Sequence, residues 1–562
     1  MRIEHALFPG RAPLRGVPSA GRRTPGHRGR CVRSGVLQHG RQTWKRRYRI
    51  VAEPHEPLLT SPWTRAFAAV TAGALPALAF PAPSLWWLAW VALVPWMLLV
   101  RSALTARRAA LEGWLGGAGF LLAVHHWLLP SLHVFILVLA ALLGLLWAPW
   151  GLLVRRLLGG VPGPGRVAAA LLVVPAGWIG VELVRSWEYL GGPWGLLGAS
   201  QWQVAPALRV ASVGGVWLVG FLVVGVNTAL VALVSAPRAR TVAVAGALVC
   251  AAVVAVVWGW APVPELAGTV RVAVVQPGVV DGVGSVQRRF DREEELTREL
   301  AGQRVDLVVW GESSVGQDLG NRPDLRDRLA ALSRSVGADL LVNVDARRSD
   351  RPGIFKSSVL VGPEGPTGDR YDKMRLVPFG EYIPARSLLG WATSVGKAAG
   401  EDRRRGSAQV VMRLPDTRGR GLLVGPLVCF ESAFPDMSRQ LAGDGAQLLV
   451  AQSATSTFQH SWAPAQHASL AALRAAETWR PMVHATLTGV STVADPRGRI
   501  VGERLGTDRS AAAVYDVPLA RGTSPYVRTG DWAVYGSLTV LALYGVVELL
   551  VWLVGKAARA SR

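Results

Sequence analysis

The sequence predicts a membrane α-helical bundle of about eight spans joined to an extracytoplasmic α/β domain. Half of the 562 residues are hydrophobic and only 18% are charged, which is more apolar than a soluble protein of this length usually is. Seven apolar segments occupy residues 65–261, and an eighth lies near the end of the chain. From Val270 onward short strands alternate with helices, which is typical of an α/β domain.

The first 60 residues are basic and rich in Gly, Pro and Arg. Residues 1–50 hold 13 Lys and Arg against one acidic residue, Glu4, so about half of the net charge of +23 lies there. The segment lacks apolar periodicity, which predicts a disordered cytoplasmic tail. A misassigned start codon is the alternative. Because the excess charge is concentrated in this tail, nucleic acid is not expected as a partner.

The apolar segments are each about long enough to cross a hydrocarbon core of about 30 Å. The predicted spans are 65–82, 84–103, 111–130, 132–154, 167–186, 208–235, 241–261 and 532–555. The second and the last are the clearest. Gly, Pro and Ala dilute the first and third, which weakens the prediction there.

Basic residues follow every second predicted span. Arg and Lys side chains remain on the cytoplasmic side of membrane proteins, so both termini are predicted to be cytoplasmic and residues 262–530 extracytoplasmic. The short loops between the other spans are nearly free of Lys and Arg. The basic positions are Arg101, Arg107, Arg108, Arg155, Arg156, Arg166, Arg238, Arg240, Lys556, Arg559 and Arg562.

The loop after the fifth predicted span contains Glu182, Arg185 and Glu188 beside a Gly-Gly-Pro sequence. Charges at that depth are unfavourable unless they are paired or face a cavity. Two interpretations are open: the wall of a pocket, or a Glu182–Arg185 pair that holds two helices together. His125 and His126, near the end of the third span, are interpreted as interfacial residues and not as ligands.

The α/β domain of about 250 residues is large enough for a core of its own. Cys31, Cys250 and Cys429 have no motif spacing, so neither a disulfide framework nor a zinc site is implied. No metal or cofactor is expected. Predicted strands cover 270–279, 305–312, 338–347, 357–365, 422–428, 446–454, 481–489 and 491–503, and predicted helices cover 285–302, 325–337 and 464–480.

Three polar residues lie at strand ends or in loops of this domain. Glu312 ends one strand, Cys429 ends another, and Lys373 lies in the sequence YDKMRLVPFGEYIP. Taken singly, they fit a cap, a small buried side chain and a surface lysine. Together they supply a base, a nucleophile and a cation, which are the groups that acyl transfer requires.

These motifs, WGES, YDKMRLVPFGEYIP and CFES in that order, resemble those of the nitrilase superfamily. The long lysine motif, the preceding spans and the single span afterwards are similar specifically to the apolipoprotein N-acyltransferases. The resemblance implies an α-β-β-α sandwich in which Glu312 is the general base, Cys429 the nucleophile and Lys373 the stabiliser of the oxyanion. It also implies supporting roles for Glu381, Glu431, Phe430 and Tyr382.

The chain departs from the family pattern at three places. Gly311 replaces the proline of a Trp-Pro-Glu motif, and Lys356 stands where an asparagine is common. Residues 453–460, SATSTFQH, replace an Asn-Asp-Ala-Trp-Phe sequence.

The resemblance implies a two-step acyl transfer without a cofactor. A membrane phospholipid would donate the acyl chain to Cys429, and the N-terminal amine of a diacylglyceryl-cysteine apolipoprotein would accept it. The implied location is the bacterial inner membrane, among membrane lipids, with a seven-span domain at 61–261, a catalytic domain at 262–530 and a last span within 531–562. The alternatives are a membrane-tethered amidase or nitrilase that uses water as acceptor, and a non-catalytic membrane scaffold.

Overall fold

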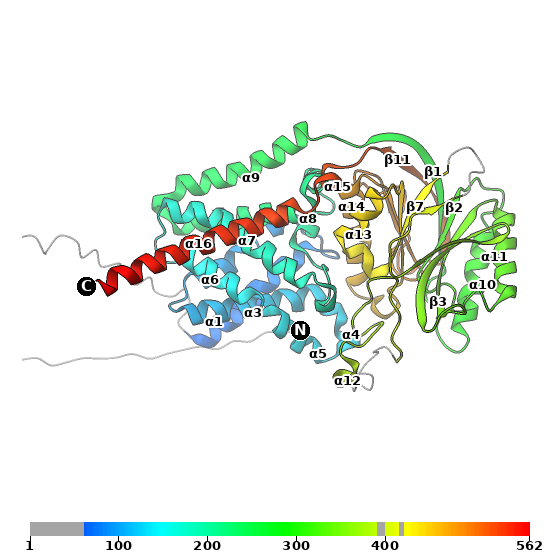
Figure 1. The fold of residues 1–562 in the computed structure, drawn as a ribbon, viewed down its shortest axis with the longest axis horizontal. Coiled ribbons are helices and arrows are strands. Elements are labelled where there is room, and N and C mark those ends of the chain that lie inside the picture. Colours follow the sequence, from blue (N-terminus) through cyan, green and yellow to red (C-terminus); the bar gives the residue numbers. More distant parts are fainter. Residues whose placement is uncertain (1–60, 391–399, 415–420, 562) are drawn as a thin grey trace, which may run out of the picture. The chain divides into compact units, whose positions relative to one another are not determined.

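The computed structural model describes residues 61–390, 400–414 and 421–561. The predicted tail, residues 1–60, lies outside the described residues. His55–Arg562 forms one compact unit. Within it, a helical bundle adjoins an α/β domain, and helix α16 returns from that domain along the bundle (Figure 1).

The bundle packs around aromatic side chains. Trp96, Trp147, Trp150 and Trp178 are almost fully buried and contact one another or Phe120, with ring centroids 4.9–6.0 Å apart. Such rings bury large apolar areas in the centre of the bundle. Its helices are α1 (Pro62–Ala74), α2 (Val94–Arg101), α3 (Ala106–His125), α4 (Leu129–Leu132), α5 (Phe135–Gly144), α6 (Trp147–Leu158), α7 (Pro164–Arg185), α8 (Ala205–Ser235), α9 (Arg240–Trp260) and α16 (Trp532–Ala560).

Several of these helices are long and apolar enough to cross a membrane. In the described part of the chain there are five, Ala106–Leu132, Pro164–Arg185, Ala205–Ser235, Pro237–Trp260 and Trp532–Ala560, and a sixth if α5 and α6, bent by 42°, form one span. The predicted spans 65–82 and 84–103 do not form single helices of that length. Helix α1 ends at Ala74, before Pro76 and Pro81, because proline lacks the N–H that a helix interior needs. The count of eight stays a prediction.

The α/β domain contains two sheets. The first has the order β11-β1-β2-β3-β4-β5 and the second β10-β9-β8-β7-β6. Strands β1, β2 and β3 are parallel, as are β7, β8 and β9, so their carboxyl ends lie at common edges. The strands are β1 (Glu265–Gln276), β2 (Leu307–Trp310), β3 (Asp339–Arg347), β4 (Ile354–Gly362), β5 (Gly365–Asp372), β6 (Met412–Arg413), β7 (Leu423–Val428), β8 (Leu448–Ser453), β9 (Met482–Thr486), β10 (Thr492–Ala494) and β11 (Ala511–Arg521).

The sheets pack face to face and helices cover their outer faces. Val274 and Val309 of the first sheet share a buried cluster with Val424 and Val450 of the second. Helices α10 (Ser285–Arg298) and α11 (Pro323–Val336) cover the first sheet, and α13 (Pro435–Gly443) and α14 (Ala463–Thr478) cover the second. This is the predicted α-β-β-α arrangement. Short helices α12 (Arg386–Leu389) and α15 (Pro525–Thr529) complete the domain.

Strand β11 is absent from the sequence-based prediction. It pairs antiparallel with β1 at the edge of the first sheet and leads through α15 into α16. Its sequence, AAAVYDVPLAR, is rich in alanine and contains Pro518, both of which weaken a strand signal. The long-range pairing with β1 decides its conformation.

Helix α8 is broken where the bundle meets α14. Gly214 and Gly215 have non-helical backbone angles, and a Cβ atom on Gly215 (φ +68°) would lie 2.7 Å from the Tyr526 ring. The freed amide of Val216 donates to Glu477 Oε1 of α14 at 2.7 Å. The break therefore connects a membrane helix directly to the α/β domain.

Candidate active site

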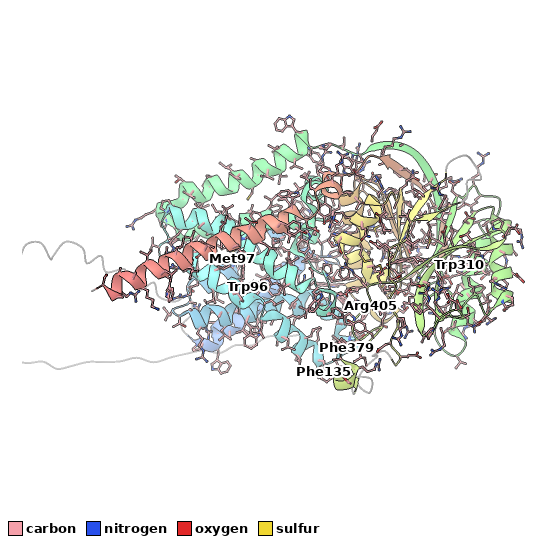
Figure 2. All side chains as sticks on the ribbon, viewed as in Figure 1. Trp96, Met97, Phe135, Trp310, Phe379 and Arg405 are labelled. Carbon is pink, nitrogen blue, oxygen red and sulfur yellow. The ribbon has the colours of Figure 1, made fainter. Side chains whose placement is uncertain are left out.

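The predicted catalytic residues emerge at the ends of strands from both sheets. Glu312 follows β2, Lys373 follows β5 directly, and Cys429 follows β7 directly. The Glu312 amide donates to the Ser453 carbonyl at the end of β8, 3.1 Å away, which holds the two sheets together at this edge. Trp310, the last residue of β2, is labelled in Figure 2 and shows where in the α/β domain the strand that leads to Glu312 ends.

Glu312, Lys373 and Cys429 lie together, with the two charged side chains buried and Cys429 half-buried. Lys373 Nζ is 3.3 Å from Glu312 Oε1 and 2.8 Å from Glu381 Oε1, and its side chain is fully buried. Cys429 and Glu312 are close enough for each to affect the pKa of the other. The structure thus brings all three residues, and the predicted supporting residue Glu381, to one place.

Burial and neighbouring charges set the protonation states. Burial acts to raise the pKa of Glu312, but Lys356 and Lys373 outweigh it and lower this pKa to about 2. Desolvation, with the Glu312 charge added, raises the pKa of Cys429 to about 12, against the opposing effect of Lys373. At neutral pH the carboxylate is therefore ionised and the proton is on sulfur.

The backbone at Cys429 is strained. Its φ of +53° lies in the left-handed region, and it begins a tight turn, Cys429–Ala433. Ser432 Oγ donates to the Cys429 carbonyl at 2.9 Å, and His467 Nε2 of α14 lies 3.0 Å from the same oxygen. Burial lowers the pKa of His467 to about 4, so the imidazole is neutral. These contacts hold the turn in a conformation that presents the thiol.

Glu431 connects the turn at Cys429–Ala433, called the nucleophile turn below for the proposed role of Cys429, with residues 371–384, called the lysine segment. Its Oε1 accepts from the Tyr371 hydroxyl at 2.7 Å and from the amides of Met374 and Arg375 at 2.8 and 3.0 Å. Its Oε2 accepts from the Val428 amide at 2.8 Å. Glu381 acts similarly, because its Oε2 accepts from the Val377 amide at 2.8 Å while its Oε1 contacts Lys373.

Phe430 and Tyr382, also predicted as supporting residues, contact the loop that follows α7. The Phe430 ring packs against Phe434, and a Cβ atom on Gly192 would lie only 2.5 Å from it. Tyr382 meets Tyr189 edge-on, and the Arg405 guanidinium lies 5.4 Å from its ring centroid. Both side chains therefore join the site to the bundle and lie beside the charged cluster.

Glu182 and Arg185 brace that loop. Glu182 Oε1 accepts from the Leu197 amide at 2.7 Å, and Arg185 donates to the Trp194 carbonyl at 2.7 Å. Among the described residues no ion pair within 4 Å joins the two side chains to each other. The interpretation as a direct Glu182–Arg185 ion pair is therefore not supported, because each side chain contacts backbone instead. His125 and His126 contact backbone carbonyls of their own helix.

A cavity of about 690 Å³ is lined by residues of the bundle and of the segment that directly follows Lys373. The ends of α7 and α16 and the middle of α8 contribute Leu183, Leu538 and Trp217, and the lysine segment contributes Met374 and Arg375. The neighbouring Glu188 pairs with Arg405, labelled in Figure 2, at 2.5 Å. The loop with the Gly-Gly-Pro sequence thus forms part of a pocket wall, as one of the two interpretations expected.

The departures from the family pattern have structural counterparts. A Cβ atom on Gly311 would lie 1.9 Å from the Leu487 amide, so the backbone approach there excludes any side chain. In segment 453–460, the Phe458 ring lies 4.9 Å from Trp127 of the bundle. Lys356 Nζ lies 2.8 Å from Glu312 Oε1.

Sequence reasoning assigned no role to Lys356 or His467. For Lys356 the available signal was its departure from the asparagine that is common at this position in the family. His467 lies on a helix with a continuous buried surface, and nothing in its spacing indicated a contact with the nucleophile turn.

Known proteins resemble both regions of the chain. The apolipoprotein N-acyltransferase N-terminal domain matches residues 72–229, and the carbon-nitrogen hydrolase domain matches residues 271–524. The apolipoprotein N-acyltransferase of Geobacter metallireducens is 32% identical over 505 residues, which cover 84% of this chain and 94% of that protein. The one from Azotobacter vinelandii is 32% identical over 510 residues, covering 86% and 94%.

Two similar solved structures each cover less than half of this chain. A nitrilase-superfamily amidase from Nesterenkonia has 18% identity and a TM-score of 0.33, covering 49% of this chain and 95% of its own. A carbon-nitrogen hydrolase superfamily protein from Xanthomonas campestris has 18% identity and a TM-score of 0.35, covering 45% and 91%. Because the full-length relatives span the bundle and the α/β domain alike, this chain belongs to the apolipoprotein N-acyltransferase family, with a nitrilase-like carbon-nitrogen hydrolase domain.

Proposed function

We propose that this protein transfers an acyl chain from a membrane phospholipid, through a thioester on Cys429, to the N-terminal amine of a diacylglyceryl-cysteine apolipoprotein. The observation that carries the proposal is the cluster of Glu312, Lys373 and Cys429 in a domain that packs against a bundle of apolar helices. Phe430, the residue after Cys429, contacts the loop of the bundle that follows α7. The family relatives support the same acyl transfer to lipoproteins.

In the first step the Cys429 sulfur attacks the ester carbonyl of the phospholipid. Because the thiol pKa is high and the carboxylate is ionised, the proton passes to Glu312 as the carbon–sulfur bond forms. Lys373 donates to the oxyanion that develops on the carbonyl oxygen. Collapse of the tetrahedral intermediate breaks the ester bond, and the leaving lysophospholipid oxygen takes the proton from Glu312.

In the second step the acceptor amine attacks the thioester. Glu312 removes a proton from the attacking nitrogen, an amide bond forms, and the carbon–sulfur bond breaks. The proton returns to the sulfur, so Cys429 is again a thiol and the site is restored. The thioester survives between the steps only where water is excluded.

The position of the cavity is suited to a lipid donor. Transferring about fifteen methylenes from lipid into water costs on the order of 12 kcal/mol at about 0.8 kcal/mol each. The part of the pocket lined by Leu183, Trp217 and Leu538 would keep part of the chain in apolar surroundings and so reduce that cost, whereas charged side chains such as Glu188, Arg375 and Arg405 line the rest. A hydrolase of small soluble amides would need no such pocket.

We further propose eight spans, with both termini cytoplasmic and the catalytic domain, 262–530, outside the bacterial inner membrane. Arg101, Arg155 and Arg166, which follow the second and fourth predicted spans, line one pocket, which supports their location at the same end of the bundle. Glu548 of α16 pairs with Arg156 at 2.9 Å in that region. Glu548 lies about 26 Å along the helix, at about 1.5 Å per residue, from the N-cap residue Asp531, which pairs with Arg439 of the α/β domain.

Intact-protein mass spectrometry after mixing with phospholipid alone tests the mechanism. We expect one acyl adduct, cleaved by neutral hydroxylamine and mapped to Cys429, with equimolar lysophospholipid, and discharge of the adduct on adding a diacylated lipopeptide. Cys429→Ala should form no adduct, and Glu312→Gln and Lys373→Ala should form it at least about 100-fold more slowly. Free fatty acid without an adduct would indicate a hydrolase, and no lysophospholipid would contradict acyl transfer.

A further inference from the structure

A second lysine lies inside the charged cluster. Lys356 Nζ, from the middle of β4, is 2.8 Å from Glu312 Oε1, 3.2 Å from Glu381 Oε1 and 3.7 Å from Asp345 Oδ2 of β3. Its side chain is only 13% exposed. It is closer to the Glu312 carboxylate than Lys373 is, since the latter contact measures 3.3 Å.

The charges that face Lys356 balance one another. Three cations, Lys356, Lys373 and Arg403, face three carboxylates, those of Glu312, Glu381 and Asp345, and Arg403 lies 3.4 Å from Asp345. Cys429, the buried Glu431 and the neutral His467 are further titratable groups beside the cluster, since Lys373 acts on the pKa of Glu431 and both Glu312 and Lys373 act on that of His467. The three cations therefore offset only the three carboxylates that they contact. An asparagine in place of Lys356 would leave these carboxylates with one cation fewer, in surroundings where an unbalanced charge is strongly unfavourable.

The two lysines have different tasks once a substrate reacts. Lys373 must donate to the oxyanion, and its contact with the Glu312 carboxylate weakens at that moment. Lys356 keeps its short contact with Glu312 Oε1, so the carboxylate does not lose every cationic partner while it exchanges a proton with sulfur.

We propose that Lys356 is a positioning residue that holds the Glu312 carboxylate next to Cys429 and supplies a positive charge that offsets the carboxylates around it. The inference rests on the proposed role of Glu312 as base. It assigns to Lys356 a function that goes beyond the three residues of the proposed mechanism.

The sign of the effect follows from the charges. Lys356 is among the groups that lower the pKa of Cys429, against desolvation and Glu312, which raise it to about 12. Removing the Lys356 charge therefore raises the pKa of Cys429 further and makes the thiolate scarcer at a given pH. Each unit of pKa corresponds to about a tenfold change in thiolate concentration.

The test is the rate of alkylation of Cys429 by iodoacetamide, measured by peptide mass spectrometry on the full-length purified protein between about pH 7 and 11. Lys356→Asn and Lys356→Met should both slow alkylation at least about tenfold at about pH 9, corresponding to a shift of one pKa unit or more. Lys356→Arg should stay close to wild type. Asp345→Asn, which removes a negative charge from the cluster, should change the rate in the opposite direction. Cys250, in the bundle, is the internal control thiol and should react equally in all variants.

An unchanged Cys429 rate in Lys356→Asn and Asp345→Asn would overturn the proposal. A slow rate in the methionine variant alone would also overturn it, since the hydrogen bond and not the charge would then matter. Should Lys356→Met fail to fold, the opposite changes in rate expected for Lys356→Asn and Asp345→Asn still test the proposal. The assay contains no lipid, so a protein that shows these shifts but never forms an acyl-enzyme would contradict the proposed function alone.

Discussion

Among the single residues of the site, Glu431 contacts mainly backbone amides and not the Cys429 sulfur. Its fully buried carboxylate accepts hydrogen bonds from the Tyr371 hydroxyl and from three backbone amides, two on the lysine segment and one before the nucleophile. The contacts with Tyr371, Met374 and Arg375 connect β5 and the segment after it with the turn that follows β7, so this one side chain helps to set the distance from Lys373 to Cys429.

Glu431→Gln should therefore weaken both the fold and the chemistry. The amide of glutamine places N–H donors against backbone N–H donors, and a buried donor without an acceptor costs about 1–3 kcal/mol. We expect a lower midpoint of thermal unfolding and slower formation of the acyl-enzyme, with the Cys429 adduct as readout. The exposed Glu364→Gln is the matched control and should match wild type. Equal stability and rate in both variants would show that Glu431 does not couple the two segments.

At the level of elements, helix α14 connects the bundle with the nucleophile turn. Near its start, Gln466 Oε1 accepts from the indole N–H groups of Trp127 and Trp194 at 3.2 and 2.8 Å. The next residue, His467, contacts the Cys429 carbonyl, and Glu477 near its end caps the broken helix α8. A displacement of the bundle against α14 would therefore reach the nucleophile within one helix.

Glu477 should make this joint sensitive to pH. Burial raises the pKa of Glu477 to about 7, against the opposing effect of Arg474, which lies 2.9 Å away, and of Arg439. The nearby Asp531 adds to the increase. A carboxyl whose pKa is raised in the folded state binds its proton more tightly there, so stability falls as the pH rises from about 4.5 through about 7, by about 3 kcal/mol at most. Glu477→Gln keeps an oxygen for the Val216 amide without the charge.

The difference in unfolding midpoint between Glu477→Gln and wild type should accordingly grow from pH 5 to pH 8, with the variant gaining. Thermal unfolding of the detergent-purified proteins at a series of pH values measures it. Curves that run parallel across this range would mean that the Glu477 carboxyl does not titrate in the folded protein.

At the level of the whole molecule, the bundle and the α/β domain share one continuous set of contacts. Trp127, Trp194 and Trp202 of the bundle belong to the same apolar cluster as Leu427 and Phe434 of the α/β domain. The Arg405–Glu188 pair adds a charged contact beside the cavity. The catalytic domain thus contacts the bundle mainly through α14 and α15, which pack against α8 (Figure 1).

The proposed topology places the two faces of the bundle in different compartments. An alkaline phosphatase reporter is active only outside the cytoplasm, so a fusion after Arg240 should be inactive and an insertion at the turn near Gly365 should be active. A fluorescent protein that folds in the cytoplasm should give the reverse pattern. Activity of both phosphatase fusions would contradict the eight-span arrangement, because both sites would then lie on the extracytoplasmic side of the membrane.

Local patterns in the sequence determined the apolar segments, most strands and helices of the α/β domain, and the motifs with Glu312, Lys373 and Cys429. These features depend on residues close together along the chain. The clustering of the three side chains, the Lys356 contact, the four bonds to Glu431 and the break in α8 were decided only by tertiary structure. Lys356 shows the reason, because a lysine in a strand does not by itself indicate which group it contacts. The pairing of β3 with β4 and the packing of the two sheets direct its ammonium group toward Glu312, and they exclude the water that would otherwise screen the two charges.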